Sequence, residues 1–370
     1  MTTRHWPCAN APPQCSIPPI KAFNEGESIM KRQAHLIGSV GLEDAETVFT
    51  TASEILRDCC SRLPDGETGK RGYWIRWQQQ TFDGCDDLAM ENVNVKIPGF
   101  KDTMERPFYK IKDGINPLAI DLGELGYGQE AVASYALFSR LQEEGKIPAN
   151  MRFQASIASP MALLCGFVMA EDRLRLEPAI NAAMARDMET LQSRVPPEKL
   201  AVQWDICYEI VGADGGPPIP YDDHVTGTAT RTAALCGLVK NGVECGIHLC
   251  YGDPGHQHII EPESLATSVA FANAICAASP RQIDFMHMPV PRGRTDDEYF
   301  KPLEGLNLPA ETRLILGLVH HTDGTDGGRR RMATADRYVQ KYDIATECGF
   351  GRRDPATIPD LLKIHRDLCV

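Results

Sequence analysis

The sequence predicts a single-domain α/β protein, a (β/α)8 TIM barrel, and three observations support this fold class. Short apolar segments of strand type alternate with segments of helical spacing, which is the pattern of a parallel sheet. Eight such strands favour a closed barrel, with a doubly wound open sheet as the alternative. No Gly-x-Gly-x-x-Gly turn or P-loop follows any strand, which argues against a dinucleotide or nucleotide enzyme.

Length and charge exclude several classes of protein. The chain has 370 residues and a net charge of −12, with a pI near 5.4, so neither nucleic acid nor an anionic membrane is expected as a partner. No apolar run is long enough to span a bilayer. The first residues contain no apolar signal core, so we expect a cytoplasmic protein whose thirteen cysteines are mainly reduced thiols.

The first third of the chain contains two expected strands and a long insertion. Residues 1–30 are rich in proline and lack periodicity, which predicts an irregular N-terminal extension ahead of a barrel domain at 31–370. The expected elements that follow are strands at 34–40 and 60–63 and helices at 42–57 and 71–80. The pattern from about 82 to 126 is irregular and interrupted by prolines, which predicts an insertion of the kind that forms a lid or a substrate wall.

The rest of the chain alternates more regularly between the two periodicities. The expected strands are apolar and end at turn-forming or polar residues, at 151–157, 199–205, 243–250, 282–288, 312–319 and 342–347. The expected helices have apolar residues three or four apart, at 129–144, 160–170, 173–193, 226–241, 263–279, 332–340 and 355–368.

Polar residues are concentrated where the strands end. In a (β/α)8 barrel the active site forms at the C-terminal ends of the strands. The residues at or just beyond those ends are Ser39, Glu67, Ser159, Asp205, His248, Cys250, His287, His320, His321 and Cys348, while the strand bodies are apolar. This segregation predicts an enzyme.

Four of these residues have the chemistry of a zinc site. His248 and Cys250 are two residues apart on a strand, so their side chains point to the same face. Cys348 ends the last strand, where Gly349 lets the backbone bend, and His287 is the natural fourth ligand on an intervening strand. Two thiolates and two imidazoles form a tetrahedral Zn²⁺ site without net charge. The alternative is a pair of core cysteines beside two hydrogen-bonded histidines.

The chain resembles the cobalamin-independent methionine synthases, in particular the single-barrel relatives of their C-terminal catalytic domain in the superfamily that also contains uroporphyrinogen decarboxylase. The resemblance covers most of residues 34–368. It rests on motifs at the strand ends: Ile37-Gly38-Ser39, Asp65-Gly66-Glu67, Ser159-Pro160, Gln203-Trp204-Asp205, His248-Leu249-Cys250 and Glu347-Cys348-Gly349.

The resemblance implies a zinc-dependent methyltransferase, in which Zn²⁺ activates the thiol of homocysteine or a related amino thiol. Ser39 would bind the carboxylate of the amino acid, and Glu67 and Asp205 would bind its ammonium group, although each carboxylate could instead serve as a local cap. Ser159 falls at a further motif of the substrate site. His320 or His321 would be the general acid, and a loop histidine bonded to its own turn is the alternative.

The chain differs from the family at two places in the site. His287 stands where the family has a glutamate ligand, and Ile206-Cys207 replace the Glu-Pro that follows the aspartate. The methyl donor would be 5-methyltetrahydrofolate, a corrinoid or another methyl source. Two alternatives remain: a barrel recruited to specialised metabolism with non-methyl chemistry, and a binding protein whose zinc is structural or absent. Metal analysis separates the second of these from the enzyme.

Overall fold

The structure is a computed structural model that describes residues 31–96, 101–254 and 257–369. The expected N-terminal extension, 1–30, lies outside the described residues. The strands of the described chain are β1 (Ala34–His35), β2 (Arg62–Pro64), β3 (Leu88–Lys96), β4 (Thr103–Ile111), β5 (Arg152–Ala158), β6 (Leu200–Ile206), β7 (Glu244–Leu249), β8 (Phe285–Pro289), β9 (Arg313–Val319) and β10 (Asp343–Thr346).

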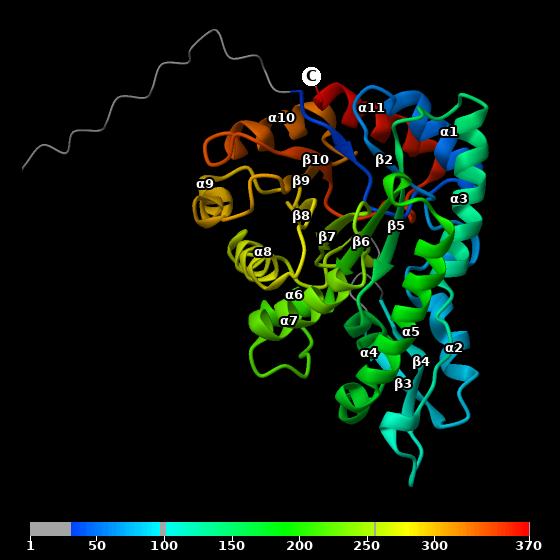
Figure 1. Cartoon of the computed structure of the whole chain (residues 1–370). Coiled ribbons are helices and arrows are strands. Elements are labelled where there is room, and N and C mark those ends of the chain that lie inside the picture. The colour runs from blue at the N-terminus through cyan, green and yellow to red at the C-terminus, as the bar shows by residue number, and fades with distance from the viewer. Residues whose placement is uncertain (1–30, 97–100, 255–256, 370) are drawn as a thin grey trace, which may run out of the picture. The chain divides into compact units, whose positions relative to one another are not determined.

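Eight of these strands form one parallel sheet that closes into a barrel (Figure 1). Their order is β1-β10-β9-β8-β7-β6-β5-β2, so neighbours along the chain are neighbours in the sheet. Isolated parallel bridges from Ala34 to Cys60 and from Ser39 to Gly66 connect the segments at the two ends of this order. The predicted (β/α)8 barrel is therefore confirmed, and the open sheet is excluded.

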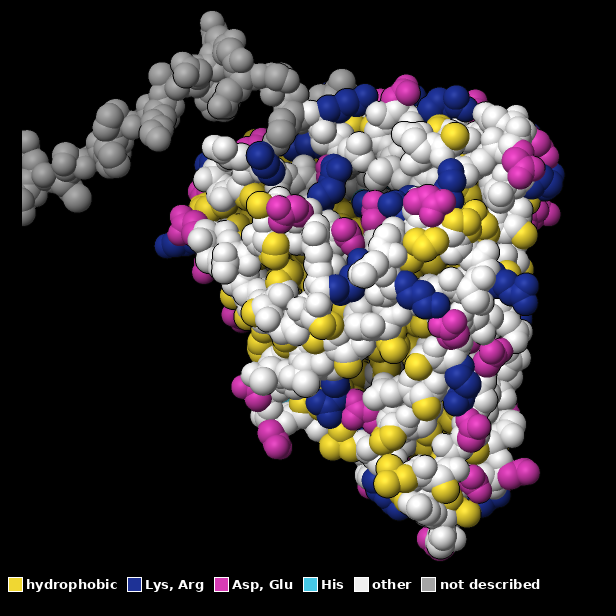
Figure 2. Space-filling view, in the orientation of Figure 1, with side chains coloured by type: hydrophobic (Ala, Val, Ile, Leu, Met, Phe, Trp, Pro, Cys, Tyr) yellow, Lys and Arg dark blue, Asp and Glu magenta, His cyan; other side chains and the backbone are white. Residues whose placement is uncertain are grey.

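Helices surround the barrel (Figure 1). They are α1 (Ala45–Leu56), α2 (Gln79–Asp83), α3 (Tyr127–Glu143), α4 (Pro160–Phe167), α5 (Arg173–Arg194), α6 (Tyr208–Ala213), α7 (His224–Gly237), α8 (Ala266–Ala278), α9 (Asp297–Phe300), α10 (Gly324–Ala335) and α11 (Ile358–Leu368). None of the helices in the described ranges is both long and apolar enough to cross a lipid bilayer. On the face shown in Figure 2, acidic and basic side chains are interspersed.

The insertion contains regular structure that the sequence pattern did not indicate. β3 and β4 pair along their whole length as an antiparallel hairpin, from Leu88 opposite Ile111 to Lys96 opposite Thr103. Most β3 residues are half-buried or exposed on both faces of the hairpin. The hairpin therefore lacks the apolar alternation by which a half-buried strand is recognised, and the ladder of backbone hydrogen bonds holds it.

Two helices differ from the prediction for reasons that are visible in the structure. The expected helix at 71–80 is broken into short turns, because Trp74 has a left-handed backbone with φ of +53°. The last expected helix before β10, at 332–340, instead spans 324–335. Gly328 in this helix is a packing position, since a Cβ there would lie 2.4 Å from Leu368 Cδ1. Because glycine is typical of turns, the sequence pattern placed the start of the helix too late.

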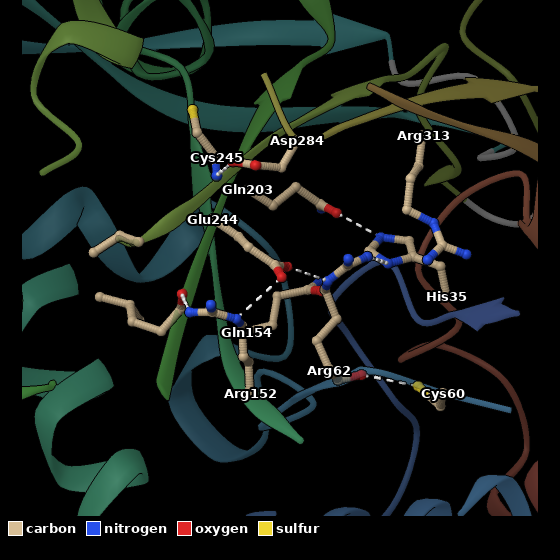
Figure 3. A network of polar contacts seen from close by, with 12 residues as sticks. His35, Cys60, Arg62, Arg152, Gln154, Gln203, Glu244, Cys245, Asp284 and Arg313 are labelled. Carbon is tan, nitrogen blue, oxygen red and sulfur yellow. Dashed lines mark hydrogen bonds and ion pairs between the residues drawn. The ribbon is translucent and has the colours of Figure 1, made fainter. Parts of the chain in front are cut away.

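The N-terminal end of the barrel is filled by a polar network that leads toward the strand ends (Figure 3). Arg62 Nε donates to Glu244 over 3.0 Å, and Arg62 NH1 lies 3.4 Å from His35 Nδ1. His35 Nε2 donates to Gln203 Oε1 over 2.8 Å, and the Gln203 amide nitrogen donates to Asp205 over 2.9 Å. Burial lowers the pKa of His35 well below its ordinary value, so the ring is neutral. The network therefore holds the Asp205 carboxylate in place from the N-terminal side of the barrel.

Candidate active site

Three of the predicted metal ligands meet at the C-terminal end of the barrel. His248 lies on β7, Cys250 follows that strand, and Cys348 follows β10. Their ligand atoms all lie within 4.8 Å of one another, and the sulfurs of Cys250 and Cys348 are 3.5 Å apart. Two sulfurs bound at ~2.3 Å to one tetrahedral ion are about 3.8 Å apart. The donor set and this spacing fit Zn²⁺.

The fourth predicted ligand, His287, lies behind His248. Its Nδ1 is 2.8 Å from His248 Nδ1, and its Nε2 is 3.0 Å from the backbone oxygen of Thr346. A carbonyl oxygen only accepts, so His287 carries its proton on Nε2, and its Nδ1 accepts from His248 Nδ1–H. Burial lowers the pKa of His287 to about 3 and that of His248 well below its ordinary value. Both rings are therefore neutral, and the lone pair on His248 Nε2 is available to a metal ion.

The three-ligand group (His248, Cys250 and Cys348) is accompanied by a third thiol and a cation. Cys207 lies within hydrogen-bonding range of Cys250. The Cys207 thiol and burial raise the pKa of Cys250 well above the ordinary value. The Cys250 thiol and burial do the same to the pKa of Cys348. Arg352 opposes this rise at Cys348 and is held by Asp253 at 3.1 Å. A divalent cation would reverse the rise, because a coordinated thiol is deprotonated.

Two carboxyl groups that form no ion pair with any described residue make up the second part of the site. Asp205 is buried, and burial together with the charge of Glu67 raises its pKa well above the ordinary value. Burial raises the pKa of Glu67 to about 7, although the Arg71 guanidinium opposes this rise. Asp65 already pairs with Arg71, whereas no described residue hydrogen-bonds the Glu67 carboxylate. A cation bound between them, such as an ammonium group, would stabilise the ionised forms of both carboxyl groups.

Glu67 and Ser39 are positioned by glycines that allow close approach. A Cβ on Gly38 would lie 2.6 Å from Glu67 Oε1, and a Cβ on Gly349 would lie 2.4 Å from Ser39 Oγ. Glu67 itself has a left-handed backbone with φ of +50°, which is uncommon for a residue with a side chain and concentrates at functional sites. Ser39 Oγ accepts from the backbone N–H of Gly351 over 3.2 Å.

Aromatic side chains close the space above Glu67. The cavity there is only about 10 Å³ and is lined by Glu67, Arg71, Trp74, Trp77, Tyr127, Ser156 and Ala158. That volume holds about one water molecule, so an amino acid would have to displace part of this wall. The buried hydroxyl of Tyr127 has no hydrogen-bond partner in the described chain. Trp74, by contrast, hydrogen-bonds Asp205.

Ser159 is directed away from the other predicted substrate-binding residues. Its hydroxyl accepts from the backbone N–H of Ala162 over 3.2 Å and caps α4. Ser159 also hydrogen-bonds Glu209 and lines a different cavity from the one above Glu67. The backbone N–H of Ser159 donates to the backbone oxygen of Asp205 over 3.0 Å, but its hydroxyl group is directed toward Glu209 and not toward Ser39 or Glu67.

The two predicted general acids differ in their surroundings. His320 is buried, donates from Nε2 to the backbone oxygen of Val290 over 2.9 Å, and places Nδ1 3.6 Å from Glu347. Burial lowers its pKa. His321 is half-buried and has no hydrogen bond to any described residue.

The sequence assigned neither a catalytic nor a ligand role to His258 and Glu347. His258 Nε2 lies 3.0 Å from Glu347 Oε2, and its Nδ1 lies 3.0 Å from Glu261. Although burial opposes it, these carboxylates raise the pKa of His258 to about 9, so the ring is cationic at neutral pH. Glu347 is thus shared by His258 and His320. The one local signal was the position of Glu347 beside Cys348.

Comparison with solved structures supports the fold. No protein-family model matches the chain, and no curated protein does. A B12-independent methionine synthase from Shewanella sp. W3-18-1, in complex with selenomethionine, matches with a TM-score of 0.58 at 12% identity, covering 92% of this chain and 97% of that chain. A methyltransferase from Methanosarcina mazei matches with a TM-score of 0.49 at 12% identity, covering 92% of this chain and 95% of that chain. At this identity the Shewanella structure shows a shared fold.

Proposed function

We propose that this protein is a zinc-dependent methyltransferase that methylates the thiol of homocysteine or a related amino thiol. The observation that carries the proposal is the convergence of one imidazole and two thiols from β7 and β10. The same barrel end carries two carboxyl groups, Glu67 and Asp205, that form no ion pair with any described residue. The fold is shared with a methionine synthase that was solved in complex with selenomethionine, which supports an amino-acid substrate with a sulfur-containing side chain.

The zinc ion would be held by His248, Cys250 and Cys348. It would lower the pKa of the substrate thiol and keep that thiol deprotonated for attack on a methyl group. His287 would orient His248 rather than coordinate, since both of its ring nitrogens already have partners. Three protein ligands leave a fourth position open for the substrate sulfur, as in other catalytic zinc sites.

The amino-acid end of the substrate would be bound by the second part of the site. The ammonium group would lie between Glu67 and Asp205, where it would return both carboxyl groups to their ionised forms. Ser39 would bind the carboxylate through its hydroxyl group. Gln203 would hold Asp205 in place through the hydrogen bond of 2.9 Å from the barrel network.

We place the proton donor at the pair of histidines on Glu347. Of the two acids predicted from sequence, His320 is the buried one and is oriented by its contacts with Val290 and Glu347. Cationic His258 would supply a proton to His320 through the Glu347 carboxylate that both rings contact. The methyl donor, 5-methyltetrahydrofolate or another carrier, would approach from the open side of the barrel end.

Metal analysis and substrate binding test the proposal together. Purified protein should contain about one zinc per chain, and Cys250→Ser should lower this content toward none. Cys276→Ser, a half-buried cysteine on α8, is the matched control and should keep the metal. Homocysteine should add one sulfur at ~2.3 Å to the zinc X-ray absorption spectrum.

The outcome also separates the alternatives. Zinc with thiol binding but without methyl transfer from any methyl carrier would indicate a barrel recruited to other chemistry. Zinc without thiol binding would indicate a structural ion, and protein without zinc at full cysteine reduction would overturn the proposal.

A further inference from the structure

A second cavity lies outside the barrel, between the helices that follow β5 and β6. Its volume is about 150 Å³, and it shares no lining residue with the space above Glu67. Ser159 and Glu209 lie at its inner end, and Asn181 and Ala234 at its exposed mouth. Its volume is about fifteen times that of the space above Glu67, so the cavity has room for a small organic molecule.

Glu209 is the feature of this cavity that the fold leaves unexplained. Its residue is 4% exposed, and its Oε2 is buried without a hydrogen-bond partner in the described chain. Ser159 and backbone N–H groups hydrogen-bond the carboxyl group, yet burial dominates and raises its pKa to about 7. A buried acceptor without a donor costs free energy, which a ligand with an N–H donor would recover.

The charges around the cavity leave one negative charge unbalanced. Glu177 and Arg231 form a two-pronged ion pair at 2.5 and 3.1 Å. The Arg231 guanidinium also lies over the ring of Tyr221, at 4.0 Å from its centre. This pair is neutral as a unit, so the ionised Glu209 carboxylate has no counter-charge among the lining residues. A monocation therefore fits the cavity better than an anion or a neutral molecule.

The walls of the cavity are mainly apolar. Met161, Leu235 and Leu238 line it between Glu209 and the mouth, and Tyr221 adds an aromatic side. A ligand with a charged head at Glu209 would thus place an alkyl chain along these side chains. Each methylene buried there should strengthen binding by a factor of about four.

We propose that this cavity is a second binding site, for a small primary alkylammonium ion whose head group donates to Glu209. The site is independent of the proposed zinc centre, because none of its lining residues belongs to that centre. The amine would be a ligand distinct from the amino thiol that the barrel end accepts.

The probe for this site is n-butylammonium, measured by calorimetry on the full chain at pH 8 with n-butanol and butyrate as comparison ligands. The wild type should bind n-butylammonium at least about ten times more tightly than either comparison ligand. Affinity should rise about fourfold per carbon from methylammonium to n-butylammonium. Glu209→Gln should remove the preference for the amine, and Glu198→Gln, an exposed glutamate elsewhere, should keep it.

A second variant tests the cavity without changing the carboxyl group. Ala234 is an exposed residue of α7 at the mouth, so Ala234→Phe should fold normally and weaken n-butylammonium binding at least tenfold. Equal binding of n-butylammonium and n-butanol by the wild type would overturn the proposal. So would an unchanged amine affinity in Ala234→Phe, even if Glu209→Gln failed to fold.

Discussion

At the scale of single residues, the site depends on the protonation of side chains that are far apart in the sequence. The Thr346 carbonyl fixes the tautomer of His287, and His287 fixes that of His248. His287 is a neutral ring that accepts a hydrogen bond from His248. In the proposed zinc site, His287 would therefore exchange the predicted role of a metal ligand for that of an orienting contact.

The first prediction concerns this exchange. His287→Ala should weaken zinc binding about 10- to 100-fold, because loss of an outer hydrogen-bond partner frees the ligand ring. His287→Gln, which can still accept and donate, should recover most of the affinity. Competition with a chelator measures both variants. The wild-type X-ray absorption spectrum should show one imidazole on zinc, and two imidazoles would instead make His287 a ligand.

The second prediction concerns Glu67 and pH. The folded protein holds a proton on Glu67 up to about pH 7, whereas the unfolded chain releases it near pH ~4.3. Between these two pH values the native state binds more protons than the unfolded chain, so the free energy of unfolding falls as pH rises. The destabilisation by Glu67 is complete above about pH 7. Glu67→Gln should therefore raise the melting temperature at pH 8 and leave it unchanged at pH 4.

The control for this variant is Glu54→Gln, at an exposed residue of α1. It should leave the melting temperature unchanged at both pH 8 and pH 4. Glu67→Gln should also lose amino-thiol binding, because the ammonium group would lose one of its two carboxylates. A melting temperature that falls at pH 8 would show that Glu67 has a native cationic partner.

At the scale of elements, the ends of β7 and β10 carry the proposed metal ligands, and a glycine-rich turn follows β10. Gly349 follows Cys348 and packs against Ser39, which lies beyond β1. This contact couples the predicted carboxylate-binding residue to a predicted metal ligand through one backbone position. A side chain there would push the two apart.

The third prediction tests that coupling. Gly349→Ala should destabilise the protein by about 1–3 kcal/mol, the usual cost of overpacking, and should weaken zinc binding as Cys348 is displaced. Gly293→Ala is the matched control, because a Cβ there meets nothing within 4 Å, and its effect should stay within about 0.5 kcal/mol. Urea titration and chelator competition give the two quantities. Equal effects of both variants would contradict the packing argument.

At the scale of the whole molecule, the proposed zinc centre lies at one end of a barrel that has its own apolar core. Apolar side chains from all eight barrel strands and the surrounding helices fill that core. In this respect the protein differs from zinc fingers, whose folding depends on the metal. Stability and metal binding should therefore be separable.

The fourth prediction follows from this separation. Removal of metal with a chelator should leave the far-ultraviolet circular dichroism spectrum unchanged and lower the melting temperature. Zinc at a hundred times its dissociation constant should restore about 2.7 kcal/mol of stability. Cys250→Ser should show no such gain. Loss of helical signal on chelation would mean that the metal is structural.

The sequence by itself determined the fold class, most of the elements and the three-ligand group. Strand and helix periodicities are local properties, and a barrel topology brings every strand end to one face whatever the side chains are. His248, Cys250 and Cys348 could be grouped on that basis alone. The β3–β4 hairpin and α10 were missed because exposed strands and packed glycines produce no amphipathic pattern.

Only the tertiary structure decided which of the remaining residues act together. It placed His287 behind His248, Glu347 between His258 and His320, and Ser159 beside Glu209 rather than Glu67. These relations depend on side-chain direction and on distances of a few ångströms between segments far apart in the chain. Residue order and periodicity do not encode such distances; the packing of the whole barrel sets them.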